Sequence, residues 1–300
     1  MATPSSQARV LVTGLSGFTG QYVAAALEAS GFAVLGRPPA DISYDLRDPA
    51  SLQRLIELTQ PDYVVHLAAV SFVAHGSATD MYAVNAVGTD NLLRALASSA
   101  PSVAKVLVAS SANVYGNATD LPITELTPTA PVNHYACSKL AMEYLARTWM
   151  DKLPLVIVRP FNYTGVGQDE NFLVPKLVGH FVRRLPVVEL GNIDVERDFS
   201  DVRSVAEAYV RLLAQAPAGE TFNLCSGQST SLRWILEHLT ALTGHSIEVS
   251  VNPGLVRSNE IQRMVGSRAH AEERVGALEW IDFHSTLAWM CREWPANPSG

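Results

Sequence analysis

Short, continuously apolar runs alternate with longer segments of mixed polarity through the first half of the chain. The apolar runs predict strands at 9–14, 32–36, 63–69, 104–110 and 153–160, and the segments between them predict helices at 17–29, 76–99 and 134–150. Strands that are apolar throughout are typical of a parallel sheet covered by helices on both faces. The alternation therefore predicts an α/β fold built on a doubly wound parallel sheet.

The regular alternation loosens after Pro160. A helix at 203–215 and a strand at 221–227 are predicted to return to the sheet, whereas the remaining sequence is rich in Pro, Gly, Arg and Trp. We therefore expect a sheet domain and a smaller C-terminal lobe. The expected ranges are 8–165 and 199–228 for the sheet domain, and 166–198 and 229–300 for the lobe.

Composition and charge narrow the class of protein. Of 300 residues, 48% are hydrophobic and 17% are charged, which is typical of a folded globular protein. A net charge of −7 without a run of Lys or Arg argues against nucleic-acid binding. No apolar run is as long as a membrane span, the first residues lack the pattern of a secretory leader, and the three cysteines contain no C-x-x-C. The sequence predicts a cytoplasmic protein without a metal site and without a nucleic-acid or membrane partner.

Three glycines, Gly14, Gly17 and Gly20, follow the first predicted strand and open the first predicted helix. Glycines at these positions let the backbone turn tightly and let a pyrophosphate approach the N–H groups of the helix N-terminus. With 19 glycines in the chain, chance gives roughly 0.1 occurrences of G-x-x-G-x-x-G. The pattern favours a Rossmann-type dinucleotide site over a glycine-rich turn without a ligand.

The end of the second predicted strand bears on which dinucleotide binds. An NAD site normally has an acidic side chain there for the ribose 2′-OH, whereas this chain has Gly36 followed by Arg37. A guanidinium suits a 2′-phosphate, so NADP(H) is favoured over NAD(H). The alternative is an ordinary exposed arginine at the end of a strand. Asp45 and Leu46 follow the next segment, where a carboxylate could hold the adenine amino group.

Tyr135 and Lys139 are four residues apart on one face of a predicted helix. With nine tyrosines and four lysines, chance gives roughly 0.1 such pairs. The fourth predicted strand delivers Ser110 and Ser111 to the carboxyl edge of the sheet, where ligands bind in open α/β folds. In such a set the Lys139 ammonium would lower the pKa of the Tyr135 phenol toward neutrality. Tyr135 would then exchange a proton with a substrate oxygen that Ser111 orients, unless Ser111 only caps the strand.

These motifs together resemble the extended short-chain dehydrogenase/reductases, the NAD-dependent epimerase/dehydratase family. The resemblance covers nearly the whole chain, through T-G-x-x-G-x-x-G at 13–20, H-L-A-A at 66–69, N-A-V-G-T at 85–89, S-S-A-N-V-Y-G at 110–116, Y-x-x-x-K, R-P-F-N at 159–162, L-G-N at 190–192, R-D-F at 197–199 and R-S-N-E at 257–260. It is closest to GDP-mannose 4,6-dehydratases and GDP-4-keto-6-deoxy-D-mannose reductases. It also implies a homodimer, because helices near 80–98 and 134–150 are apolar on more than one face, as in family dimers joined by a four-helix bundle.

The resemblance implies that the sheet domain binds NADP and that the smaller lobe binds the nucleotide sugar, and it implies roles for individual residues. Ser111, Tyr135 and Lys139 would form the catalytic set. Residues placed at the cofactor would be Gly14, Ser16, Gly17, Phe18, Thr19, Gly20, Arg37, Asp45, Leu46, Leu67, Ala68, Ala69, Tyr135, Lys139, Pro160 and Phe161. Residues placed at the nucleotide sugar would be Ser110, Ser111, Asn113, Asn162, Lys176, Arg197, Arg257 and Glu260.

Asn113 separates activities within the family. The related 4,6-dehydratases carry a glutamate two residues after the catalytic Ser or Thr, because water elimination needs an acid–base group. An amide cannot supply that proton transfer, so we expect NADPH-dependent reduction of the C4 ketone of a nucleotide-linked 4-keto-6-deoxy sugar, with GDP expected from the resemblance. The alternatives are a 4-epimerase, a 4,6-dehydratase and a non-catalytic NADP sensor. The exact sugar and the stereochemistry of the product stay open.

Overall fold

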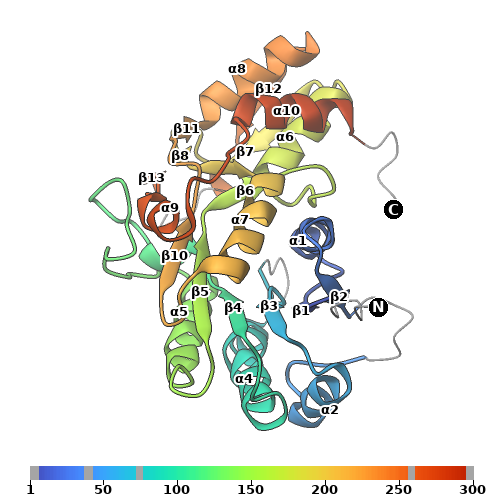
Figure 1. The fold of residues 1–300 in the computed structure, drawn as a ribbon. Helices are drawn as coiled ribbons and strands as arrows, with labels where there is room; N and C mark the ends of the chain where they lie inside the picture. The colour runs from blue at the N-terminus through green and yellow to red at the C-terminus, as the bar shows by residue number, and fades with distance from the viewer. Residues whose placement is uncertain (1–6, 37–42, 72–76, 256–260, 295–300) are drawn as a thin grey trace, which may run out of the picture.

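The computed structural model describes residues 7–36, 43–71, 77–255 and 261–294. Its main sheet has six parallel strands in the order β10-β5-β4-β3-β1-β2 (Figure 1). The strands are β1 (Arg9–Thr13), β2 (Ala33–Leu35), β3 (Tyr63–His66), β4 (Lys105–Ala109), β5 (Leu155–Pro160) and β10 (Thr221–Leu224). The prediction of a doubly wound α/β fold is confirmed, including the late return of β10 to the sheet.

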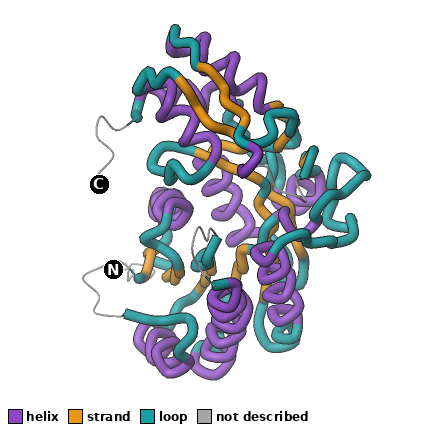
Figure 2. The backbone as a smooth tube through the Cα atoms, turned by 180° about the vertical axis from the view of Figure 1, so that it is seen from behind, coloured by secondary structure: helices purple, strands orange, loops and turns teal. Residues whose placement is uncertain are grey.

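Helices cover both faces of this sheet, as Figures 1 and 2 show. α1 (Phe18–Ala29) and α7 (Val202–Gln215) pack on one face, and α2 (Pro49–Thr59), α4 (Gly88–Ser99) and α5 (His134–Arg147) pack on the other. Successive residues of a strand contribute to opposite cores, so that Val10 and Val12 of β1 lie in one core and Leu11 in the other. Because both faces are buried, the strands are apolar at every position.

Two helical regions depart from the sequence prediction. α2 is absent from the predicted elements, although Asp48 caps it by accepting a hydrogen bond from Ala50 N and a proline opens its first turn. The predicted helix at 76–99 is divided into α3 (Ala78–Met81), the π-helix η1 (Tyr82–Val87) and α4. Within η1 the Asn85 amide donates to Val70 O and to Ser138 Oγ, which ties the loop after β3 to α5.

The smaller lobe lies above the sheet in Figure 1. Its core is formed by α6 (Leu173–Val182), α8 (Leu232–Thr243), α10 (Phe283–Arg292) and the parallel pair β7 (Val187–Leu190) and β12 (Glu248–Val251). α9 (Ala269–Val275) instead packs in the core next to α7, so this segment lies with the sheet. The domain boundaries expected from the sequence stay a prediction.

Short elements connect the two parts. β6 (Asn162–Thr164) pairs in parallel with β9 (Phe199–Asp201). β8 (Glu196–Arg197) lies between β11 (Thr230–Ser231) and β13 (Arg263–Met264). Two short 3₁₀ helices follow strands: η2 (Ala112–Tyr115) comes after β4, and η3 (Pro253–Leu255) comes after β12.

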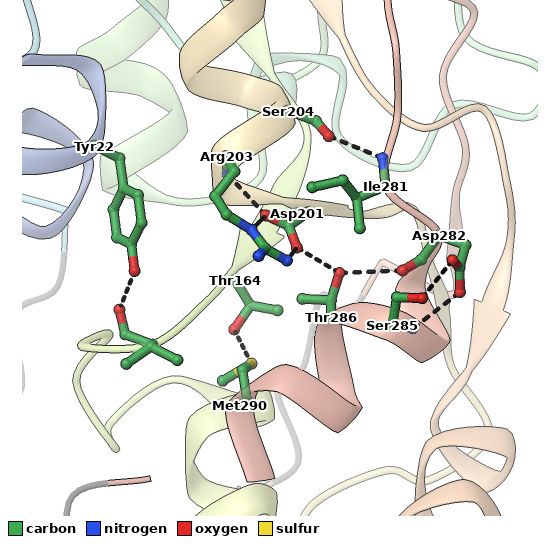
Figure 3. A network of polar contacts seen from close by, with 11 residues as sticks. Tyr22, Thr164, Asp201, Arg203, Ser204, Ile281, Asp282, Ser285, Thr286 and Met290 are labelled. Carbon is green, nitrogen blue, oxygen red and sulfur yellow. Dashed lines mark hydrogen bonds and ion pairs between the residues drawn. The ribbon is translucent and has the colours of Figure 1, made fainter. Parts of the chain in front are cut away.

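A polar network fixes α10 of the smaller lobe against α7 (Figure 3). The fully buried Asp201 carboxylate caps α7, pairs with the Arg203 guanidinium at 2.7 Å and accepts from the Thr286 hydroxyl at 2.8 Å. The Arg203 guanidinium carbon also lies 3.8 Å from the centroid of the Trp289 ring. Since α10 belongs to the core of the lobe, this network holds the lobe in one position over the edge of the sheet.

α1 approaches the end of β1 so closely that only glycine fits. Gly14 has a φ of 74°, and a Cβ on it would lie 2.8 Å from Ala68 N. A Cβ on Gly20, in the first turn of α1, would collide with the Gly14 carbonyl oxygen. Because the colliding atoms belong to the backbone, no side chain can move aside to make room.

We expect Gly20→Ala to lower the free energy of unfolding by about 1–3 kcal/mol, the usual cost of overpacking a close contact. Gly254→Ala is the matched control, since it lies on the surface and its Cβ would meet only the Asn252 side chain, at 3.2 Å. Urea denaturation measures both changes. An equal, small effect for the two variants would show that the approach of α1 to β1 tolerates a side chain.

Candidate active site

The carboxyl ends of the central strands meet at one edge of the sheet, next to the start of α1. β2 and β3 lie on opposite sides of β1, so the strand order reverses at this edge, where ligands of open α/β sheets bind. α1 begins at Gly17 without a side-chain cap, and its first turn holds no acidic residue. The N–H groups at this helix start suit an anion such as a pyrophosphate. Ser16 is exposed there, and the Thr19 hydroxyl shares a 2.7 Å hydrogen bond with the Tyr163 phenol.

A buried histidine fixes the strand ends beneath this helix start. The His66 ring nitrogens lie 2.6 Å from Thr13 Oγ1 and 2.9 Å from Thr89 Oγ1. Thr89 donates its own proton to Asn85 O, so it accepts from His66 Nε2, and the Thr13 hydroxyl donates to His66 Nδ1. Burial, helped by the charge of Lys139, lowers the pKa of His66 to about 3. The neutral imidazole therefore joins β1, β3 and α4 without adding a charge to the site.

The other residues predicted at the cofactor differ in burial and in their contacts. Residues 67–69 follow β3 and are partly buried along the same edge. The Asp45 carboxylate pairs with Arg47 at 2.7 Å, which lowers its pKa to about 2, and the Leu46 side chain is buried. Pro160 ends β5 and is partly buried, whereas the Phe161 side chain is buried in an apolar cluster and its N–H donates to Leu224 O at 2.8 Å. Arg37 lies outside the described residues.

The structure brings Ser111, Tyr135 and Lys139 together. Asn133 caps α5, its side chain accepting from Ala136 N at 2.8 Å, and this places Tyr135 in the first turn of the helix. Ser111 follows Ser110 after the end of β4. It caps η2 and also hydrogen-bonds the Tyr135 phenol, so the capping role does not prevent a contact with Tyr135. One turn along α5, Lys139 Nζ donates to Ala109 O at the end of β4, at 2.8 Å.

The prediction of a lowered phenol pKa is wrong for this structure. Burial, with an added contribution from Tyr163, raises the pKa of Tyr135 to about 12, although the hydrogen bond with Ser111 opposes the rise. The Lys139 ammonium is bonded to a main-chain carbonyl instead of the phenol. Burial also lowers the pKa of Lys139 to about 8, against the opposing effect of Glu143. Tyr135 is therefore a protonated phenol at neutral pH.

The residues predicted to bind the sugar divide into two groups. Asn113 is partly exposed in η2, two residues after Ser111, and Asn162 follows the end of β5. The Asn162 amide nitrogen is buried and has no hydrogen-bond partner among the described residues, so it suits a ligand oxygen. Ser110, in contrast, is buried and donates to Glu143 Oε1 at 2.6 Å, which places its hydroxyl beneath the site and away from a substrate.

The basic residues predicted at the diphosphate lie in the smaller lobe. Lys176 Nζ of α6 donates to Glu189 O at 2.6 Å, and Arg197 Nη1 of β8 donates to Glu196 O at 2.9 Å and to Gln262 O at 3.3 Å. Gln262 follows closely the segment that carries Arg257 and Glu260. Those two residues lie outside the described part of the chain.

Sequence reasoning missed Tyr163, which links the two halves of the site. Its phenol contacts Thr19 at the start of α1, and its ring stacks on Phe18 at 6.3 Å between centroids. It also contributes to the raised pKa of Tyr135. Next to it, the Tyr22 phenol donates to Val166 O at 2.7 Å (Figure 3). The available signal was its place directly after Asn162, on the strand that leaves the sheet edge.

The described residues also bear on other classes of site. Within residues 7–36, 43–71, 77–255 and 261–294, no group of three His, Cys, Asp or Glu side chains is placed to hold a metal ion. In the same part of the chain, no helix has both the length and the apolar character needed to cross a membrane.

Comparisons with known proteins agree with this geometry. Residues 10–225 match the NAD dependent epimerase/dehydratase family. GDP-6-deoxy-D-talose 4-dehydrogenase of Aggregatibacter actinomycetemcomitans is 39% identical over 86% of this chain and 88% of its own length. GDP-6-deoxy-D-mannose reductase of Pseudomonas aeruginosa is 36% identical over 96% of this chain and 98% of its own. The structure of RMD from Pseudomonas aeruginosa complexed with NADPH has a TM-score of 0.87 and 35% identity, covering 96% of this chain and 97% of that one.

Proposed function

Because the chain belongs to the NAD-dependent epimerase/dehydratase family, we propose that it uses NADPH to reduce the C4 ketone of a nucleotide-linked 4-keto-6-deoxy sugar, with GDP as the nucleotide. The names of the two relatives, both GDP-6-deoxy-sugar oxidoreductases, support this substrate class. 6-Deoxy-D-talose and 6-deoxy-D-mannose differ in configuration at C4. Reduction of the same C4 ketone can give either sugar, depending on which face of the carbonyl receives the hydride. The two names therefore support this ketone and leave the face of hydride transfer open.

The observation that carries the proposal is the protonated Tyr135 phenol beside Ser111. A phenol with a pKa of about 12 holds its proton at neutral pH and can deliver it to the oxygen of a ketone that is being reduced. The Ser111 hydroxyl, hydrogen-bonded to the phenol, would orient the same oxygen. A 4-epimerase must first oxidise a sugar hydroxyl, which requires a tyrosinate base. Ketone reduction instead needs the phenol only as a proton donor, the form in which it is present at neutral pH.

The residues at the sheet edge fit a dinucleotide. The glycine backbone lets β1 turn tightly into α1 at the sheet edge, and the uncapped start of α1 would hold the pyrophosphate. Residues 67–69 would line the cofactor between its two halves. When bound, NADPH would supply the hydride. NADPH is proposed over NADH because Arg37 follows the second strand and because a relative at 35% identity binds NADPH.

Asn113 supports a reductase over a dehydratase. It is partly exposed beside Ser111, at the position where an acid–base group for water elimination would be needed. A neutral amide can donate a hydrogen bond to a sugar hydroxyl but cannot remove a carbon-bound proton. Ketone reduction needs no such step.

We also infer a homodimer. Val87 of η1 and Tyr144 of α5 are large apolar residues that stay 52% and 62% exposed, on the helices expected to form a four-helix bundle. Pairing of the same faces in two copies would cover both side chains.

We expect Tyr135→Phe to lower turnover by about two to four orders of magnitude, because it removes the proton donor while the ring still packs. Cofactor affinity should change little. Tyr144→Phe, an exposed tyrosine on the same helix, is the control and should keep its activity. Steady-state kinetics with a GDP-4-keto-6-deoxy sugar checks this, and near-native turnover of Tyr135→Phe would exclude Tyr135 as the donor.

We expect Arg37→Ala to raise the Michaelis constant for NADPH much more than that for NADH. The lost charge-assisted contact corresponds to roughly 1.5–3 kcal/mol. Arg54→Ala, an exposed arginine of α2, controls for the change in net charge. Equal effects of Arg37→Ala on the two cofactors would show that Arg37 does not contact the 2′-phosphate.

The reaction class is tested by supplying GDP-mannose and a GDP-4-keto-6-deoxy sugar separately, while following NADPH absorbance and product mass. Only the keto sugar should consume NADPH, with a gain of two hydrogens in the product. Loss of water from GDP-mannose without net consumption of cofactor would make the chain a dehydratase. Interconversion of two GDP-hexoses without net consumption of cofactor would make it an epimerase.

A further inference from the structure

Tyr163 lies on the segment 162–166, which leaves the sheet after β5. It is the middle residue of β6, and β6 pairs in parallel with β9, where Tyr163 is opposite Ser200. The paired backbone fixes the direction in which its side chain points. The phenol meets the first turn of α1, 144 positions away in the sequence, where it shares a 2.7 Å hydrogen bond with Thr19 Oγ1.

This contact lies where the nicotinamide half of a dinucleotide is expected. In the sheet, β5 is separated from β1 by β4 and β3, so Tyr163 and Thr19 bring together segments from strands that are not neighbours. The start of α1 suits the pyrophosphate, whereas Ser111 and Tyr135 stand after β4 and on α5. For the hydride to reach a ketone that Tyr135 protonates, the nicotinamide half has to lie between the helix start and Tyr135.

Packing and a second phenol fix the same two segments. The Phe18 ring, at the start of α1, stacks on the Tyr163 ring with 6.3 Å between centroids and an angle of 11° between planes. Further along α1, the Tyr22 phenol donates to Val166 O at 2.7 Å (Figure 3). Tyr22 and Tyr163 therefore both join α1 to the segment 162–166, but only Tyr163 does so at the helix start.

The pair formed by Thr19 and Tyr163 has one hydrogen-bond donor to spare. Each hydroxyl carries one proton, and burial raises the pKa of Tyr163, so its phenol keeps that proton at neutral pH. The shared bond uses one of the two protons, and within the described part of the chain neither hydroxyl has another hydrogen bond. The spare O–H stands beside N–H groups of the first turn that have no partner within the helix. Tyr22, in contrast, uses its only proton in the bond to Val166 O.

We propose that Tyr163 is a cofactor-binding residue, whose phenol donates to an oxygen of the nicotinamide half of the dinucleotide while the Thr19 hydroxyl donates to the phenol oxygen and holds it in place. The phenol takes the ligand because its O–H is more acidic than that of threonine. The inference rests on the dinucleotide site of the proposed function and not on the sugar. A phenol that only joined the segment 162–166 to α1 would not distinguish one half of the cofactor from the other.

Four variants separate binding from structure. Tyr163→Phe removes the phenol oxygen and keeps the ring that stacks on Phe18. Tyr22→Phe is the matched control, because it removes a phenol that joins the same two segments. Thr19→Val removes the hydroxyl with little change in shape, and Thr19→Ser keeps the hydroxyl.

The direct readout is isothermal titration calorimetry of the full chain, without any sugar, using NADPH and adenosine 2′,5′-bisphosphate. The second ligand has the adenosine half of the cofactor and lacks the nicotinamide half. We expect Tyr163→Phe to raise the Kd for NADPH about fivefold to tenfold, as for the loss of one hydrogen bond, and to leave the Kd for the bisphosphate unchanged. Tyr22→Phe should change neither. An unchanged Kd for NADPH in Tyr163→Phe, or an equal rise for both ligands, would overturn the proposal.

The role of Thr19 is tested by combining variants. Thr19→Val alone should raise the Kd for NADPH by a smaller factor, about twofold to fivefold, and Thr19→Ser should bind like the wild type. In the Tyr163→Phe background Thr19→Val should have no further effect, because no phenol is left to hold. Effects that multiply in the double variant would show that Thr19 contacts the cofactor by itself, which contradicts the proposed direction of the bond.

The same measurement separates this proposal from the proposed function. Because no sugar is used, a failure of ketone reduction leaves the result for Tyr163 as it stands. If the wild type binds NADH in place of NADPH, the proposed cofactor is wrong, and the comparison of NADH with adenosine diphosphate then decides the role of Tyr163 by the same criterion.

Discussion

The close contact between the end of β1 and the first turn of α1 is the constraint on which the rest of the site depends. No side chain fits at Gly14 or Gly20, because Gly14 lies against Ala68 after β3 and the first turn of α1 lies against Gly14. Beneath it, His66 joins the same two strands to α4 through neutral hydrogen bonds. An anion-binding helix start is thereby held at the edge where α5 also delivers its tyrosine.

Burial then decides the chemistry available at that edge. It raises the pKa of Tyr135 and lowers the pKa values of Lys139 and His66, which favours the neutral form of each group. A neutral phenol is a proton donor at the start of a turnover, as the proposed reduction of a ketone requires. The relatives' names and the amide at Asn113 support the same proposal.

Much of this could be predicted from the sequence, because it depends on local pattern. The apolar strands, the glycines after β1 and the four-residue spacing of Tyr135 and Lys139 are local patterns, and each predicts its structure without reference to distant residues. α2 carried such signals too, in a capping Asp48 and in Leu52, Leu55 and Ile56 at helical spacing. The phenol pKa and the burial of Ser110 could not be predicted. The first depends on burial, with Tyr163 as a smaller cause, and the second on the bond to Glu143, and both arise only in the folded chain.

In the proposed reaction the ketone carbon receives its hydrogen from NADPH. It is tested most directly by incubating the protein with NADPH deuterated at C4 of the nicotinamide, separately on each face, and a GDP-4-keto-6-deoxy sugar. NMR of the product then locates the label. We expect one deuterium on C4 of the sugar from one face of the nicotinamide and none from the other. A reduced product that lacks deuterium at C4 with either cofactor would contradict it.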